Sequence, residues 1–243
     1  MSRRRGGPGG GSRSPRGGGA GVGRRRAAER VRSARSRKAG STRWLQRHIN
    51  DPFVHEARRH GYRARAAFKL LELDDRFGFL KPGARVVDLG AAPGGWTQVA
   101  VERVRPGDTR GRVVALDALE VEPVPGAEVI QADFLEPDAP ETIKTALDGA
   151  ADVVLSDLSP DTTGHKPTDH RRIVLLVEAA WVFAQEVLAP GGTFVAKVFR
   201  GGTEGDVLDE LKRSFRRVRH VKPEASRKES PEIYVVATGY KGE

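Results

Sequence analysis

Three aspartates lie at the ends of three successive predicted strands. Asp88 lies in the run VVDLG, Asp117 ends VVALD and Asp133 ends VIQAD. The carboxyl ends of parallel strands meet at one edge of a sheet, where open α/β folds bind ligands. A carboxylate after the second strand can accept both hydroxyls of a ribose, and one after the third can accept the amino group of adenine. The spacing therefore predicts a nucleoside pocket.

The loop after the first of these strands, GAAPGG over 90–95, consists of small residues. Its backbone is open to a ligand at the strand ends. Gly90, Ala92 and Gly95 also fit a degenerate dinucleotide fingerprint, and a tight turn without a ligand is another interpretation. Because no second fingerprint for a pyrophosphate follows, the pattern favours S-adenosylmethionine over a nicotinamide dinucleotide.

Lys197 lies in the apolar run TFVAKVF, which reads as a buried strand. A charge in such a strand needs a partner or a chemical purpose. Burial disfavours the ammonium form, and a neutral lysine can accept a proton. Asp157, at the end of ADVVLSD, is a further candidate, although Ser-Asp shortly before a proline also forms ordinary turns.

Short Val/Ile/Leu runs alternate with helical patterns and must position these residues. Strands are predicted at 84–90, 112–119, 128–134, 151–158, 192–199, 216–223 and 232–240, and helices at 51–61, 65–80, 96–104, 140–150, 171–188 and 204–215. The alternation predicts an α/β fold with a mostly parallel seven-stranded sheet and helices on both faces. The last two strands are too close in sequence for a helical crossover, so one strand is expected to be antiparallel. This is the Rossmann-like layout of the class I S-adenosylmethionine-dependent methyltransferases.

The positive charge of the chain is concentrated at its start. The net charge is +10, but residues 1–40 alone carry +12 and residues 41–243 carry −2. The first 40 residues are rich in Gly, Arg and Ser, which predicts a disordered extension that binds RNA phosphates without recognising sequence. A merely solubilising extension is the alternative. Residues 41–243 are predicted to form one domain.

Several classes of protein are excluded by composition. The chain has no cysteine, and its six histidines show no ligand spacing, so neither disulfides nor a metal site is expected. The apolar run IVLLVEAAWVFA is interrupted by Glu178, and no apolar segment follows the basic start. We therefore expect a cytoplasmic, monomeric protein without a membrane span.

Four motifs resemble the FtsJ/RrmJ ribose 2′-O-methyltransferases over residues 41–239. They are RAAFKL at 65–70, DLGAAPGGW at 88–96, SDLSP at 156–160 and KVF at 197–199. The resemblance implies methylation of a ribose 2′-hydroxyl in RNA with S-adenosylmethionine as the methyl donor. It is greatest to the bacterial members that act on a uridine of 23S rRNA, so the large ribosomal subunit is the expected partner.

The resemblance also implies site residues. A catalytic tetrad would consist of Lys69, Asp157, Lys197 and Glu232. The cofactor contacts would be Gly94, Trp96, Asp117, Asp133 and Asp157. Without the resemblance, Lys69 is typical of a solvated helix face and Glu232 of a polar loop.

One motif departs from the family. After the catalytic aspartate the family usually continues Met-Ala-Pro-Asn, whereas this chain has Leu158-Ser159-Pro160-Asp161. The contact of this loop with substrate is therefore not carried over from the family.

RNA contacts in the domain itself are expected at two arginine-rich stretches. The first contains Arg58, Arg59, Arg63 and Arg65, and the second Arg213, Arg216, Arg217 and Arg219. Such residues can also be ordinary solvated charges. Three other functions stay open: methylation of tRNA or cap RNA, a non-catalytic ribosome-assembly factor that binds RNA, and a nicotinamide oxidoreductase, which the reversed last strand disfavours.

Overall fold

The computed structural model describes residues 45–46, 48–160, 163–200 and 205–242. The chain divides into two units, Met1–Gln46 and Arg47–Glu243, and the fold below is that of the second. The predicted extension over residues 1–40 and the predicted domain boundary at residue 41 lie outside the described residues.

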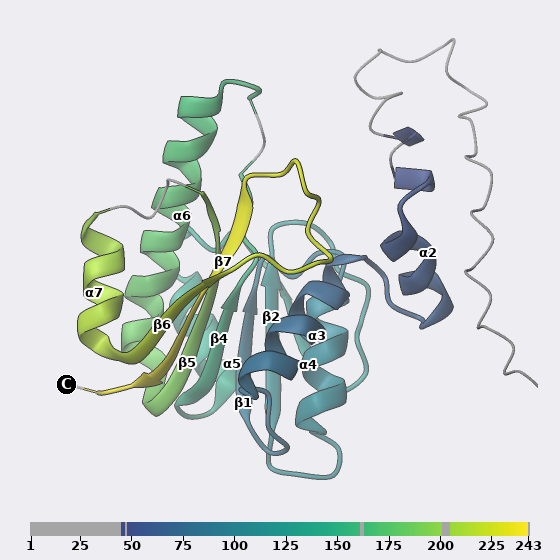
Figure 1. Ribbon diagram of the computed structural model, residues 1–243. Coiled ribbons are helices and arrows are strands. Elements are labelled where there is room, and N and C mark those ends of the chain that lie inside the picture. The colour runs from purple at the N-terminus through teal and green to yellow at the C-terminus, as the bar shows by residue number, and fades with distance from the viewer. Residues whose placement is uncertain (1–44, 47, 161–162, 201–204, 243) are drawn as a thin grey trace, which may run out of the picture. The chain divides into compact units, whose positions relative to one another are not determined.

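A seven-stranded sheet has the strand order β3-β2-β1-β4-β5-β7-β6 (Figure 1). The strands are β1 (Arg85–Leu89), β2 (Arg112–Asp117), β3 (Glu128–Gln131), β4 (Ala151–Ser156), β5 (Leu188–Phe199), β6 (Phe215–Val221) and β7 (Glu232–Tyr240). β1 to β5 pair in parallel, whereas β7 is antiparallel to both β5 and β6. The prediction of a mostly parallel sheet with one reversed strand is confirmed. The reversed strand lies one place in from the edge.

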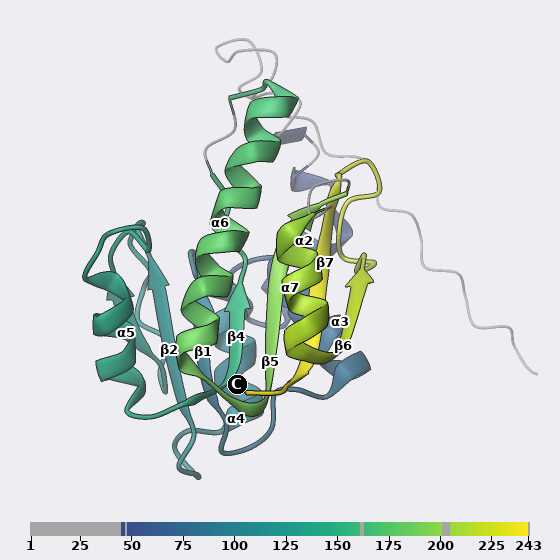
Figure 2. The same ribbon diagram turned by 90° about the vertical axis from the view of Figure 1, so that its left-hand side faces the viewer.

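Helices cover both faces of the sheet. The structure describes α2 (Pro52–Arg59), which packs on α3, and α3 (Ala66–Phe77), α4 (Gly95–Val104), α5 (Ala139–Leu147), α6 (Lys166–Val187) and α7 (Asp206–Ser214). α5, α6 and α7 pack on one face and α3 and α4 on the other, which gives a hydrophobic core on each side (Figure 2). Within the described part of the chain, no helix is both long and apolar enough to cross a membrane.

Local chemistry explains where the first helices begin and end. The Asp51 carboxylate caps α2 by accepting a 3.0 Å hydrogen bond from the backbone N–H of Phe53. α3 ends at Phe77, before the predicted limit of 80, because Gly78 adopts a left-handed conformation with φ 64°. α6 begins at Lys166, earlier than the predicted start at 171.

Gly90 allows two loops to meet at the carboxyl edge of the sheet. It follows β1 with φ +79°, and a Cβ there would lie 2.8 Å from the backbone N of Leu158. A side chain would therefore separate the loop after β1 from the loop after β4. The need for close backbone approach explains the small residue at this position.

Candidate active site

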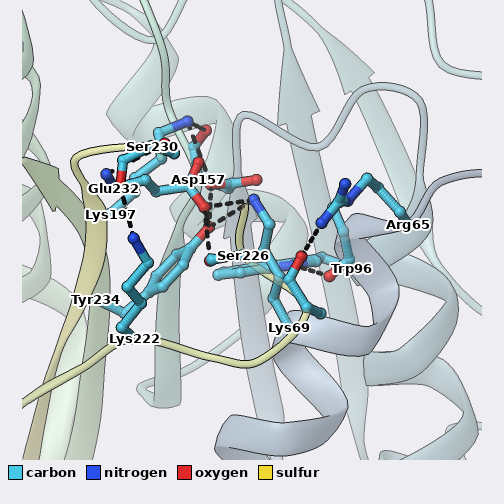
Figure 3. Close-up of polar contacts among 12 residues, drawn as sticks. Arg65, Lys69, Trp96, Asp157, Lys197, Lys222, Ser226, Ser230, Glu232 and Tyr234 are labelled. Carbon is cyan, nitrogen blue, oxygen red and sulfur yellow. Dashed lines mark hydrogen bonds and ion pairs between the residues drawn. The ribbon is translucent and has the colours of Figure 1, made fainter. Parts of the chain in front are cut away.

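Four charged side chains, supplied by α3, the loop after β4, β5 and β7, meet at the carboxyl edge of the sheet (Figure 3). Nζ of Lys69 lies 2.6 Å from Oε1 of Glu232, and Nζ of Lys197 lies 3.2 Å from Oδ1 of Asp157. Lys197 also donates a 2.7 Å hydrogen bond to the backbone carbonyl of Asp157. The four side chains predicted as a tetrad thus form two adjacent, largely buried ion pairs.

The reversal of β7 brings Glu232 to this edge. In the antiparallel pairing of β5 and β7, Phe199 lies opposite Glu232 and Lys197 lies opposite Tyr234. The first residues of β7 therefore lie beside the last residues of β5. A parallel strand would have placed Glu232 at the opposite edge of the sheet.

Tyr234 connects the two ion pairs. Its hydroxyl lies 2.8 Å from Oδ1 of Asp157 and 3.4 Å from Oε1 of Glu232, and it accepts a 3.3 Å hydrogen bond from Lys69. The single hydroxyl proton is best directed to Asp157, the nearer carboxylate. Burial, together with the charges of Asp157 and Glu232, raises the pKa of Tyr234 well above its ordinary value. Tyr234 is therefore a neutral donor at physiological pH.

Tyr234 is not among the residues predicted from the sequence, although the sequence contains one signal for it. Residues i and i+2 of a strand face the same side, so Tyr234 must share a face with Glu232. Tyrosine in a buried strand also needs a partner for its hydroxyl. The partner became evident only when the order of the strands was known.

Glu232 is held in its ionised form. Burial opposes this, but the charge and hydrogen bond of Lys69 and the charge of Lys197 outweigh burial, so the pKa of Glu232 is lower than usual. Ser226 adds a 3.0 Å hydrogen bond from its Oγ to Oε1 of Glu232.

The loop that carries Ser226 is fastened to α3. The carboxylate of Glu72 accepts hydrogen bonds from the backbone N–H groups of Glu224, at 2.6 Å, and Ala225, at 2.9 Å. Arg65 donates to the carbonyl of Ala225 and pairs with Asp51. α3 therefore supplies Lys69 and also orders the loop that supports its carboxylate partner.

A pocket of about 610 Å³ adjoins the charged cluster at the carboxyl ends of β1, β2 and β4. Its lining includes Gly90 and Ala92 and three carboxylates, Asp117, Asp133 and Asp157. Asp157 belongs both to this pocket and to the ion-paired cluster. A ligand in the pocket would therefore lie next to Lys197.

The carboxylates of the pocket are already anchored by backbone groups. Asp117 accepts 2.8 Å hydrogen bonds from the N–H groups of Ala92 and Leu119, and Asp133 accepts one of 3.0 Å from Leu135. Because a carboxylate has about four acceptor positions, both can still accept hydrogen bonds from a ligand.

Gly94 and Trp96 are not among the described residues that line this pocket. The indole N–H of Trp96 donates to the Ala66 carbonyl at 2.8 Å, and the ring packs on Tyr234 at a centroid distance of 5.5 Å. A Cβ on Gly94 would lie 2.7 Å from Nη1 of Arg63. The cofactor roles of both residues stay predictions, and a contact by the buried Trp96 would come from its backbone.

Asp88 differs from the other two strand-end aspartates. It is fully buried, and Thr97 donates a 2.7 Å hydrogen bond to its Oδ2. Its Oδ1 has no hydrogen-bond partner within the described structure, and burial raises the pKa of Asp88 to about 7. Asp88 does not line the pocket, so the grouping of three ligand-binding aspartates was wrong for this residue.

The first arginine-rich stretch is largely committed to structural contacts. Arg63 donates to the carbonyls of Pro93, Glu122 and Pro123, and Arg59 pairs with Glu56. Arg65 is occupied by Asp51 and the loop described above. The second stretch, Arg213, Arg216, Arg217 and Arg219, is exposed and forms no ion pair with any residue that the structure describes.

Comparison with known proteins agrees with this geometry. The FtsJ-like methyltransferase family model matches residues 62–240, which span both the pocket and the ion-paired cluster. The chain belongs to this family. This FtsJ-like methyltransferase is 62% identical over 222 residues to ribosomal RNA large subunit methyltransferase E of Paramagnetospirillum magneticum, covering 90% of this chain and 91% of that protein.

A second relative and a solved structure are also similar to this FtsJ-like methyltransferase. The protein of the same name from Parvibaculum lavamentivorans is 61% identical over 220 residues, covering 88% of this chain and 87% of that protein. A solved structure from Plasmodium falciparum, assigned as a ribosomal RNA methyltransferase, is 29% identical with a TM-score of 0.66, covering 75% of this chain and 100% of that one. The predicted family and methyltransferase fold are confirmed.

Proposed function

We propose that this protein transfers a methyl group from S-adenosylmethionine to the 2′-hydroxyl of a ribose in 23S rRNA, and that the methylated nucleotide is a uridine of the large subunit. The observation that carries the proposal is that two lysine–carboxylate pairs meet beside a nucleoside-sized pocket. Asp157 belongs both to one of these pairs and to the lining of the pocket. The names of the relatives support large-subunit rRNA as the substrate.

The residues of the pocket fit S-adenosylmethionine. Its volume of about 610 Å³ lies in the ordinary range for small-molecule sites. Asp117 and Asp133 provide acceptors for ribose hydroxyls and an amino group. Three leucines among its lining, Leu119, Leu135 and Leu175, are 68%, 61% and 62% exposed, and a flat base would cover this apolar surface.

The chain's own residues prepare the acceptor hydroxyl. When bound, S-adenosylmethionine supplies a methyl group on a positively charged sulfur, which leaves with the bonding electron pair. A ribose hydroxyl is a weak nucleophile, so alignment and removal of its proton are what the protein must contribute. We assign proton acceptance to Nζ of Lys197, with Asp157 orienting this lysine. The Lys69–Glu232 pair and Tyr234 fix the position of Asp157 and the hydroxyl.

The proposal is tested with labelled S-adenosylmethionine and four separate substrates: 50S particles, protein-free 23S rRNA, tRNA and capped RNA. We expect label in 23S rRNA, at a nucleotide whose 3′ linkage resists alkali, because a methylated 2′-oxygen cannot attack the phosphate. Lys197→Ala and Lys197→Arg should both lose transfer, since a guanidinium stays protonated and cannot accept the proton.

Other outcomes support the competing functions. Label in tRNA or at a cap would replace the proposed substrate, and RNA binding without label in any RNA would favour a non-catalytic assembly factor. Near-normal turnover of Lys197→Arg would remove this lysine from the role of base. The assembled subunit as substrate, the monomeric state and the cytoplasmic location stay predictions.

A further inference from the structure

A second hollow of about 460 Å³ lies at the amino end of the sheet, opposite the active site. It is formed where β1, β4 and β5 begin and where β7 ends, and its lining includes Gly83, Gly191, Gly192 and Gly239. Beyond the neighbouring residues of the chain, no described atom lies within 4 Å of the place where a Cβ on Gly191 would stand, so a ligand group can approach the backbone closely there. The mechanism proposed above makes no use of this hollow.

Four cationic side chains line the hollow: Arg76, Lys81, Arg110 and Arg217. All four are exposed, and none forms an ion pair with any residue in the described ranges. Asp152 is the one acid in the lining, and its carboxylate already accepts the backbone N–H of Arg85 at 2.8 Å. We call this set of four cations and the glycines between them the basic hollow. It concentrates positive potential that favours a polyanion.

The basic hollow continues toward the active site along β6. Arg217 and Arg219 lie opposite Thr238 and Val236 of β7, and paired residues share a face of the sheet. Val236 packs in the core beneath α3, so both arginines lie on the side of the sheet that α3 covers. The next position on this face, Val221, lies opposite Tyr234 of the active site. Successive side chains on this face are about 7 Å apart.

The two sites are close enough for one RNA to contact both. Thr193 lines the basic hollow and Lys197 lies in the active site, and both belong to β5. Four residues of strand separate them by about 13 Å.

An exposed edge strand also carries charges to prevent sheet-to-sheet pairing, which would account for both Arg217 and Arg219 of β6. It does not account for Lys81 and Arg110, which lie in loops outside the edge strand. Because these loop cations line the same hollow as Arg217, they point instead to a ligand.

We propose that the basic hollow binds backbone phosphates of the rRNA away from the methylated nucleotide, and that Arg217 and Arg219 mark the path of the RNA to the active site. The identity of this RNA rests on the function proposed above. Phosphate contacts position a nucleic acid without recognising its sequence. The basic hollow would therefore set the orientation of a folded RNA whose acceptor ribose lies at Lys197.

The test compares two double variants that lose the same charge. Lys81→Gln/Arg217→Gln removes two cations of the basic hollow. Lys144→Gln/Lys212→Gln removes two cations that are ion-paired, with Glu141 and Glu186 and with Asp209 respectively. Affinity for protein-free 23S rRNA is measured over a series of salt concentrations. We expect the slope of log affinity against log salt to become shallower by about 1.4 for the first variant, at about 0.7 per phosphate, and to be unchanged for the control.

Two results would overturn the proposal. Equal slopes for the two variants would mean that the basic hollow does not contact phosphates. A loss of affinity for intact 50S particles but not for protein-free RNA would assign the basic hollow to an acidic protein surface. Because the experiment measures binding, its result is independent of catalysis. If the wild-type protein methylates no RNA, the proposed function is refuted. If Lys81→Gln/Arg217→Gln nevertheless reduces the salt dependence of RNA binding, the basic hollow is still an RNA site.

Discussion

The hydroxyl of Tyr234 is the smallest group on which the geometry of the site depends. It donates to Asp157 while Lys69 donates to it, so one atom links the pair that includes the proposed base to the pair that supports it. A hydrogen bond to a charged group contributes about 1.5–3 kcal/mol. Tyr234 is therefore a positioning residue whose effect is expected to appear in turnover.

Tyr234→Phe should lower kcat by roughly 10–100-fold, which corresponds to the loss of that hydrogen bond. The affinity for S-adenosylmethionine should not change, because Tyr234 does not line the pocket. The measurement is kcat and KM for rRNA together with calorimetry of cofactor binding. Tyr240→Phe, a buried tyrosine at the other end of β7, is the matched control. Equal kcat in both variants would show that Tyr234 serves packing only.

At the scale of elements, two contacts decide where the site forms. β7 brings Glu232 and Tyr234 to the carboxyl edge because it runs against its neighbours. β1 and α4 are joined by the buried hydrogen bond from Thr97 to Asp88, directly beneath the loop that begins at Gly90. The second contact makes stability depend on pH.

The folded state should lose stability between about pH 4 and pH 7. Burial raises the pKa of Asp88 to about 7, whereas an unfolded aspartate has an ordinary pKa of about 4. In this interval the folded protein holds a proton that the unfolded chain has released, so the free energy of unfolding falls as pH rises, by at most about 4 kcal/mol.

Asp88→Asn removes this titration, so the free energy of unfolding of the variant should depend less on pH. Urea unfolding at pH 5 and pH 8 gives the free energy of unfolding of wild type and variant at each pH. Asp138→Asn, at an exposed position whose side chain makes no cap hydrogen bond, is the control. If the free energy of unfolding changes by the same amount between pH 5 and pH 8 in wild type and in Asp88→Asn, Asp88 does not titrate in this interval.

At the scale of the whole molecule, charge is divided between an Arg-rich start and a slightly acidic remainder. We therefore expect attraction to RNA to depend on residues 1–40 and on local groups of unpaired cations. Deleting residues 1–40 should leave cofactor affinity and thermal stability unchanged while weakening RNA association and reducing its salt dependence.

A full-length variant with serine in place of the arginines of residues 1–40 separates charge from length. We expect it to behave like the deletion in a binding series over salt concentration, because counterion release depends on the number of phosphates neutralised. An unchanged slope in both would mean that the extension does not contact RNA phosphates.

Local patterns in the sequence were sufficient to predict the strands of this protein and several of its candidate site residues. Hydrophobic runs of strand length predicted all seven strands, and the short connection before β7 predicted its reversal. The four tetrad residues came from motif resemblance, since neither Lys69 nor Glu232 is distinctive alone. Asp117 and Asp133 were predicted from their places at strand ends, which local periodicity determines.

Only the tertiary structure decided which side chains meet. The structure adds Tyr234 to the site and removes Asp88 from the predicted ligand-binding residues. Both outcomes depend on the order of the strands and on what packs above each residue. Arg63 became a structural residue and Arg217 stayed exposed, although both lie in arginine-rich stretches. Periodicity describes one element and its buried face, whereas a contact between elements depends on residues distant in sequence. For that reason the strands followed from the sequence, and the partners of their charged side chains followed from the fold.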